Sequence, residues 1–197
     1  MRFRTPTLLI ALILSFSVVA FAQSTPQNIA TYAHPSTFTD LDPSSGYSSE
    51  NVVMGNVYET LTRYALDGTV VPHLAAGWDI SDDGLQWTFT LREGITFHDG
   101  ADFDASAVVG SINRSMEINL GGAFILDPIE NVEALDPLTV RFDLSYAAPL
   151  DLILSSTYAA WMISPTHLDK PGTWFNEGND AGTGPYMITN YIPGATL

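Results

Sequence analysis

One stretch near the middle of this chain of 197 residues constrains its fold more strongly than any other. A turn-forming run, Ser81-Asp82-Asp83-Gly84, is followed by a regular alternation of apolar and polar residues. The apolar positions are Trp87, Phe89 and Leu91, and the polar positions are Thr88, Thr90 and Arg92. Because successive side chains of a β-strand point to opposite faces, this alternation predicts a strand with one buried face. The Asp-Gly turn predicts that this strand leaves an antiparallel hairpin.

Local patterns of the same kind predict further strands and two amphipathic helices. Residues 129–134 and 138–144 read as two strands on either side of a turn at Leu135-Asp136-Pro137. Asp104 is a good helix-capping residue, and Ser48 or Ser49 offers the same chemistry earlier in the chain. The expected apolar face of the helix after Ser48 or Ser49 is Val53, Val57 and Leu61, and that of the helix after Asp104 is Val108, Ile112 and Met116.

The secondary structure of the remaining segments is predicted from patterns of only a few residues. We expect a short strand at 28–33, a short helix at 150–154, another helix starting at Ser164-Pro165, a loop at 170–180 and a final strand at 186–192. No internal repeat is visible in the chain. A mixture of strands and helices indicates an α/β or α+β class.

The N-terminus has the features of an export signal. Arg2 and Arg4 precede an apolar, uncharged run at residues 8–22, which ends in Ala20-Phe21-Ala22. A transmembrane anchor is the alternative, but this run is shorter than the roughly 20 residues needed to cross a bilayer. We therefore expect a cleavable signal peptide, residues 1–22, and a mature protein that starts at Gln23.

Composition excludes several classes of function. The chain has 22 acidic residues against seven Lys and Arg and contains no cysteine. A basic patch for nucleic acid is therefore excluded, as are a disulfide, a thiolate metal site, a thiol nucleophile and an acylated lipoprotein cysteine. Loss of the signal peptide leaves five basic residues: Arg63, Arg92, Arg114, Arg141 and Lys170. A carboxylate-rich surface suits a salty habitat, although an ordinary acidic exported protein is an equal alternative.

The standard catalytic motifs are absent from the sequence. It has no G-x-S-x-G elbow, no H-E-x-x-H and no phosphate loop of the Walker type. The four histidines, His34, His73, His98 and His167, are scattered, and we expect each to be satisfied singly rather than to bind metal. Asp79, Asp82 and Asp83 fit a solvated turn better than a calcium loop. We expect no catalytic residue, no metal and no cofactor.

Several blocks, in this order, resemble the bacterial extracellular solute-binding proteins of family 5, the peptide-, dipeptide- and nickel-binding components of ABC importers. The blocks are Leu41-Asp42-Pro43, Val57-Tyr58-Glu59-Thr60-Leu61, Pro72-His73-Leu74-Ala75 with Trp78, the run from Ser81 to Gly94, Phe97-His98-Asp99-Gly100, the helix start at Asp104, and Gly182-Thr183-Gly184-Pro185-Tyr186. Most of these residues are expected to be scaffold, with Arg92 a local charge partner.

The resemblance implies a periplasmic-binding-protein-like (type II) α/β fold with two lobes, of which this chain would form part of lobe one and an extra small α+β domain. The expected parts are a signal peptide at 1–22, a first segment of lobe one at 23–50, the extra domain at 51–165, and a return to lobe one at 166–197. Members of the family continue much further, so the sequence is expected to be a fragment.

By this resemblance the protein is a periplasmic, monomeric binding protein that captures a peptide or other small solute and delivers it to an ABC permease. The alternative is an exported hydrolase of peptides or glycans. Related members contact their ligand through positions that correspond to Gly46, Tyr47, Ser48 and Phe124. Glycine would allow backbone approach, serine a hydrogen bond, and the two rings apolar contact. Equally open is that Ser48 only caps the helix and that Phe124 is a core residue.

Overall fold

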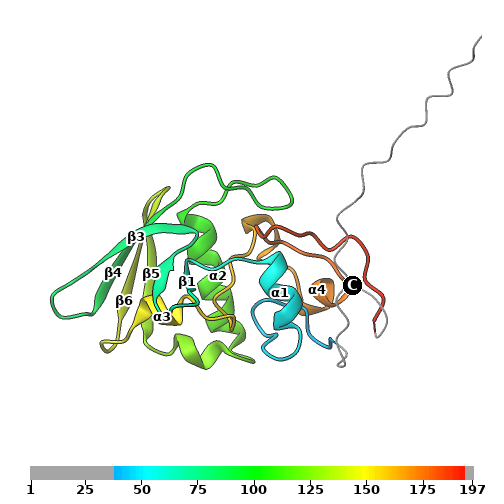
Figure 1. The fold of residues 1–197 in the computed structure, drawn as a ribbon, viewed down its shortest axis with the longest axis horizontal. Helices are drawn as coiled ribbons and strands as arrows, with labels where there is room; N and C mark the ends of the chain where they lie inside the picture. The colour runs from blue at the N-terminus through cyan, green and yellow to red at the C-terminus, as the bar shows by residue number, and fades with distance from the viewer. Residues whose placement is uncertain (1–37, 194–197) are drawn as a thin grey trace, which may run out of the picture. The chain divides into compact units, whose positions relative to one another are not determined.

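A four-stranded antiparallel sheet is the main element of residues 38–193, the part of the chain that this computed structural model describes (Figure 1). Its strands are β3 (Ala75–Ile80), β4 (Gln86–Leu91), β5 (Ile129–Asp136) and β6 (Thr139–Leu144). Their order in the sheet is β3-β4-β6-β5, and every neighbouring pair is antiparallel. The predicted signal peptide, the strand expected at 28–33 and His34 lie outside the described residues.

The hairpin predicted from the alternating run is confirmed. Gly84 has a φ of +73° and donates its N–H to the carbonyl of Ser81, which closes the turn between β3 and β4. Trp87, Phe89 and Leu91 are all buried on one face of β4. Phe89 also packs edge-on against Phe142 of the neighbouring strand β6, with ring centroids 5.5 Å apart.

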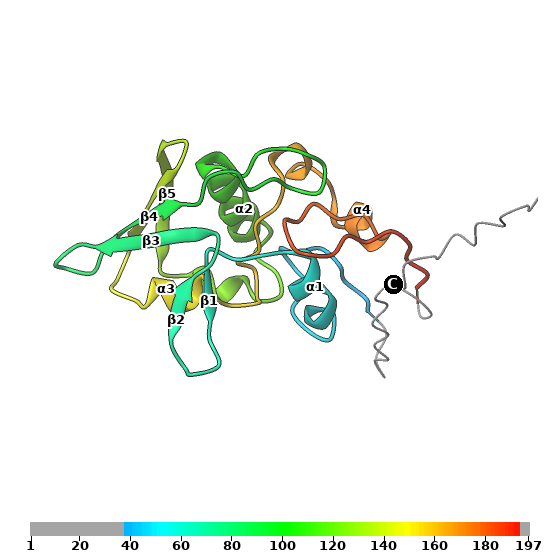
Figure 2. The same cartoon turned by 45° about the horizontal axis from the view of Figure 1, so that its top comes forward.

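Helix α2 (Ala105–Ile118) covers the buried face of this sheet (Figures 1 and 2). The predicted cap is confirmed, because the Asp104 carboxylate accepts the N–H groups of Ser106 and Ala107 at 2.9 and 3.0 Å. Val108 and Ile112 are fully buried against the sheet, and Met116 is partly buried. Asn119 ends the helix in a left-handed conformation.

A second, smaller core lies around helices α1 (Asn51–Val57) and α4 (Gly172–Asn176). Short elements complete the described chain: a hairpin of β1 (Thr62–Tyr64) and β2 (Val70–Pro72), helix α3 (Leu150–Ile153), and the 3₁₀ helices η1 (Ala123–Leu126) and η2 (Pro165–His167). The buried residues of the second core are Leu41, Met54, Val57, Tyr58, Trp161, Ile163, Phe175 and Ala181. It therefore combines segments from the beginning, middle and end of the described chain.

Three expectations about local structure are wrong. Leu61 is not on the first helix, because the chain becomes extended at Tyr58 (φ −115°, ψ 154°) and carries Leu61 into the sheet core. The segment 170–180 is not a plain loop, since it contains α4. Within the described residues, 186–191 do not form the expected strand: Tyr186 N–H bonds to the Asn56 carbonyl and Ile188 N–H bonds to a side chain.

The predicted pairs β3–β4 and β5–β6, the helix at 150–154 and a helix start at Ser164-Pro165 are confirmed. Between residues 38 and 193, no helix is both long and apolar enough to cross a membrane.

Candidate functional site

Two exposed tyrosines and a double glycine meet where three distant segments come together. The rings of Tyr47 and Tyr158 pack edge to face, with centroids 6.4 Å apart, and both are substantially exposed, at 53% and 41%. A Cβ on Gly121 would lie 1.9 Å from the Ser45 carbonyl oxygen, and a Cβ on Gly122 would lie 2.4 Å from the Cβ of Tyr158. The glycines therefore allow an approach that any larger residue would prevent.

Phe124 follows this double glycine and is 65% exposed. It lies in η1, whose Ala123 and Leu126 are buried in the sheet core. The interpretation of Phe124 as a core residue is therefore wrong. Tyr47, Tyr158 and Phe124, with the Gly121-Gly122 turn, are called the aromatic patch below.

The structure gives Gly46 and Ser48 different roles from Tyr47. Gly46 is buried, and a Cβ there would lie 2.5 Å from the Asp40 carbonyl oxygen, so its lack of a side chain serves packing within the loop. Ser48 is exposed. The expectation that Ser48 or Ser49 caps α1 is wrong, because Glu50 is the N-cap residue and its Oε1 accepts the N–H groups of Tyr47 and Ser48.

A buried ion pair anchors the loop that carries Tyr47. The guanidinium of Arg114, on α2, donates to both carboxylate oxygens of Asp42, at 2.6 and 2.7 Å. The two side chains are only 8% and 3% exposed. Arg114 also donates to the carbonyls of Leu168 and Lys170 and lies 5.0 Å from the ring centre of Phe175. This fork geometry fixes the Leu41-Asp42-Pro43 block against both cores.

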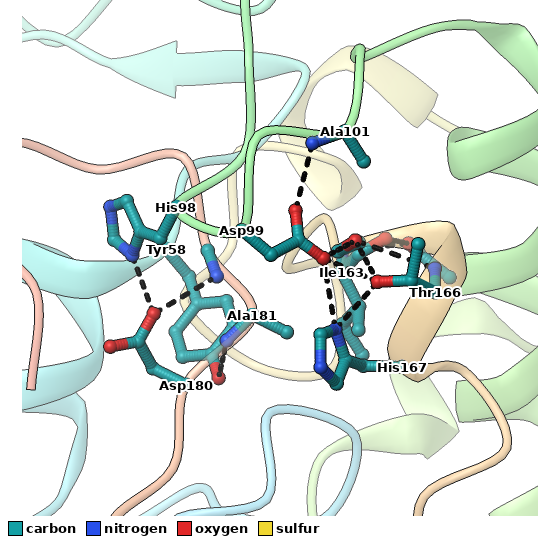
Figure 3. Close-up of polar contacts among 12 residues, drawn as sticks. Tyr58, His98, Asp99, Ala101, Ile163, Thr166, His167, Asp180 and Ala181 are labelled. Atoms are coloured by element: carbon teal, nitrogen blue, oxygen red, sulfur yellow. Dashed lines mark hydrogen bonds and ion pairs between the residues drawn. The ribbon is translucent and has the colours of Figure 1, made fainter.

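The turn at residues 97–100 is bound to the returning segment 180–184 (Figure 3). His98 lies between two acceptors: its Nδ1 is 2.5 Å from Asp180 Oδ1 and its Nε2 is 2.8 Å from the Gly184 carbonyl oxygen. Next to it the Ala181 N–H donates to the buried hydroxyl of Tyr58, and burial raises the pKa of that phenol well above its usual value. These contacts are structural, since each polar group is occupied by another part of the chain.

Asp99 contacts hydroxyl and imidazole groups of the kinds that an exported hydrolase would need (Figure 3). Its Oδ2 accepts the hydroxyls of Ser164 and Thr166 and lies 3.0 Å from His167 Nδ1. Burial acts to raise its pKa, but these hydroxyls and the Ala101 N–H outweigh it and lower the pKa of Asp99 to about 2. Ser164 is fully buried and donates to the carboxylate rather than to a histidine. The hydroxyl–imidazole contact of the cluster is between Thr166 Oγ1 and His167 Nδ1, at 2.8 Å, and the Thr166 hydroxyl already donates to Asp99, so the cluster has no serine–histidine bond of the kind that activates a nucleophile.

The histidines that the structure describes are individually paired. His73 bonds to Glu59 at 3.0 Å, His98 to Asp180, and His167 to Asp99. Within residues 38–193, no group of three or more His, Asp or Glu side chains is arranged to hold a metal ion. The expected turn at Ser81-Asp82-Asp83-Gly84 is solvated, with Asp83 bound to Ser81 and Leu85.

Sequence reasoning missed Tyr158, Glu50 and the Asp42–Arg114 pair. Tyr158 lies in the unremarkable run Ser155-Ser156-Thr157-Tyr158-Ala159, and nothing in that run signals a contact with Tyr47. Asp42 was within a recognised block, but its partner is 72 residues away. A contact at such a distance leaves no periodic trace in a single sequence.

The chain is similar to known bacterial solute-binding proteins. The model of "Bacterial extracellular solute-binding proteins, family 5 Middle" matches residues 69–197. Among curated proteins, the glutathione-binding protein GsiB of Salmonella paratyphi A is 34% identical over 96% of this chain, and di/tripeptide-binding protein 2 of Pseudomonas aeruginosa is 31% identical over 91%. The chain spans 37% and 38% of the length of these two relatives.

Solved structures of related proteins have the same fold. NikA from Brucella suis, in complex with Fe(III)-EDTA, has a TM-score of 0.68 and 31% identity, covering 79% of this chain and 32% of NikA. DppA from Helicobacter pylori, in complex with the peptide STSA, has a TM-score of 0.68 and 28% identity, covering 78% and 35% of the two chains. An oligopeptide transporter substrate-binding domain from Bacillus anthracis has a TM-score of 0.71 at 22% identity, covering 78% and 34%.

Proposed function

Because this chain belongs to the bacterial extracellular solute-binding proteins of family 5, we propose that its protein captures an oligopeptide, a dipeptide or a similar small solute and delivers it to the permease of an ABC importer. The observation that carries this proposal is the aromatic patch. Tyr47 and Phe124, expected as ligand contacts from the family resemblance, are both exposed, and Tyr47 and Tyr158 are held together by close glycine packing.

The expected type II periplasmic-binding-protein fold is confirmed by the likeness to NikA and to the Bacillus anthracis protein. Within that fold we propose that residues 23–50 and 166–197 belong to lobe one and that 51–165 contain the extra domain. The two cores support this division with one refinement. Helix α1 packs with Leu41 and Phe175, so we assign it to lobe one and start the extra domain after Tyr58.

The chemistry of the aromatic patch suits a solute of peptide type. Exposed aromatic rings offer flat apolar faces to a ligand, and each also keeps a polar edge where the residue is tyrosine. Gly46 and Ser48 flank Tyr47 in the same loop. We propose Tyr47, Phe124 and the Ser48 hydroxyl as contacts, and Gly46 as the residue that lets this loop fold tightly enough to present them.

The setting of this binding reaction follows from the family and from the N-terminus. The relatives GsiB and di/tripeptide-binding protein 2 are named for the solutes they bind, and we propose likewise a binding protein rather than an enzyme. It would be exported to the periplasm, lose residues 1–22 and work as a monomer, with no nucleic-acid partner. Sequencing of the exported protein is expected to find Gln23 first; Met1 on exported material would contradict this.

The proposal is tested by binding and turnover in one experiment. Full-length protein is titrated by calorimetry with a panel of di- to tetrapeptides and glutathione, and each mixture is then analysed by mass spectrometry after prolonged incubation. We expect saturable binding of at least one peptide and its complete recovery. Cleaved products would favour the hydrolase, and no binding to any member of the panel would contradict a peptide-type solute.

A further inference from the structure

A concave surface lies beside the β1–β2 hairpin, and no residue of the aromatic patch lines it. It is an open pocket of about 700 Å³, and its lining draws on the hairpin, the loop after β4 and the returning segment. Figure 2 shows the hairpin projecting from the rest of the described chain. The lining residues that carry the argument are Arg63, His73, Arg92, Glu59 and Glu93.

This pocket brings two arginines together in a strongly acidic protein. Only five basic residues follow the signal peptide, against 22 acidic ones, yet two of the five, Arg63 and Arg92, line this single pocket. Convergence of two arginines at one concave place is typical of a site for a negatively charged group.

Both arginines lack a carboxylate partner among the described residues. Arg114 is paired with Asp42, and Arg141 with Glu133 and Asp143. The side chain of Arg92 makes only a long hydrogen bond, at 3.4 Å, from its Nε to the Ala75 carbonyl, so the expectation that it is a local charge partner is wrong. Both arginines are exposed residues.

The acidic residues of the pocket balance the formal charge of the two arginines, but neither forms an ion pair with them. Glu59 is already bound to His73 Nε2 at 3.0 Å. Burial acts to raise the pKa of Glu59, but hydrogen bonds from His73 and the Thr183 hydroxyl lower it overall. The Glu59 carboxylate is therefore ionised and is bonded to these two partners. Glu59 and Glu93 together equal the two arginines in formal charge, so the four side chains carry no net charge. That balance suits a monoanion better than a dianion.

The uncharged part of the lining indicates what the anion is attached to. Pro72, Leu74 and Ile95 line the same pocket, with Leu74 buried and Ile95 partly buried. A guanidinium fork matches the geometry of a carboxylate, and the apolar lining offers contact for a short aliphatic chain. We propose that this pocket is a second binding site, held by Arg63 and Arg92, for a small aliphatic monocarboxylate.

The test is ligand-observed saturation-transfer NMR on the full-length protein, with butyrate as the probe at constant ionic strength. We expect a saturable butyrate signal, absent for butylamine, whose apparent affinity falls at least about tenfold in Arg63→Gln and in Arg92→Gln. Arg141→Gln is the matched control, because it removes an arginine that is already paired, and it should leave the signal unchanged.

Three outcomes overturn the assignment. A butyrate signal that does not saturate, or that persists in the Arg63→Gln and Arg92→Gln variants, removes the site. A loss of equal size in Arg141→Gln would show that only overall charge matters. If inorganic phosphate displaces butyrate at a lower concentration than acetate does, the pocket binds phosphate rather than a monocarboxylate, and the assignment is wrong. None of these results depends on whether peptides bind at the aromatic patch, so the two proposals fail separately.

Discussion

The buried pair of Asp42 and Arg114 gives the sharpest prediction about what holds the Tyr47 loop in place. Replacing Asp42 with Asn keeps the shape of the side chain but removes its charge. The Arg114 guanidinium, only 8% exposed, then loses its counter-charge and one of the two acceptors that it bonds at 2.6 and 2.7 Å, and it remains buried.

The expected cost follows from the partners that remain. Removing one member of a buried ion pair costs about 3–5 kcal/mol, because the other charge is left without compensation. Arg114 keeps the Leu168 and Lys170 carbonyls and the face of Phe175. These contacts place the expected loss for Asp42→Asn at the lower end, about 3 kcal/mol.

Urea unfolding followed by circular dichroism measures this loss in the full-length protein. The control is Glu133→Gln, which breaks the exposed pair with Arg141. Exposed pairs contribute about 0–1 kcal/mol, so this variant should unfold close to the wild type. If Asp42→Asn costs no more than Glu133→Gln, the reasoning that the Asp42–Arg114 pair anchors the loop is refuted.

Three further predictions concern the scaffold, and urea unfolding measures each. Gly182→Ala places a Cβ 2.0 Å from the Val57 carbonyl oxygen and should cost about 2 kcal/mol or more, whereas Gly77→Ala meets no atom within 4 Å and should cost little; equal losses would contradict this. Asp99 has a lowered pKa of about 2, so its stabilisation is present above pH 4 and is lost as the pH falls from about 4 to 2. Asp99→Asn should therefore lose about 1–2 kcal/mol at pH 6 after allowance for solvent screening, and match the wild type near pH 2; a gap that persists at pH 2 would contradict the linkage. Asp104→Ala removes the cap of α2 and should cost about 1 kcal/mol, and an unchanged midpoint would exclude a capping role.

Local signals predicted the parts of the fold that depend on neighbouring residues. The hairpin before β4 follows from the period-two alternation and from Gly84, and α2 follows from Asp104 and its buried stripe. Helix α4 escaped prediction because it has five residues and no side-chain cap. The expected strand at 186–192 failed because the Tyr186 N–H bonds to the distant Asn56 carbonyl and the Ile188 N–H bonds to the side chain of Asp180, eight residues earlier.

In the candidate site, too, some features could be predicted from the sequence and others depend on the tertiary structure. Tyr47 and Phe124 could be proposed only through the family resemblance, because neither belongs to a motif with chemistry of its own. Their exposure and the contact between Tyr47 and Tyr158 depend on the tertiary structure, where Gly121 and Gly122 bring three segments together. A contact between segments so distant in the chain cannot be predicted from a single sequence.

The central claim is that the aromatic patch contacts a captured solute. The most direct measurement is calorimetric titration of the full-length protein with its best-binding peptide, comparing the wild type with Tyr47→Ala and Phe124→Ala. Tyr146→Ala is the matched control, since Tyr146 is 55% exposed against 53% for Tyr47 and lies outside the patch. Loss of an aromatic contact that the solute buries costs about 1–3 kcal/mol, so we expect affinity to fall about 5- to 150-fold in the two patch variants and to stay unchanged in Tyr146→Ala. Wild-type affinity in both patch variants would contradict the account.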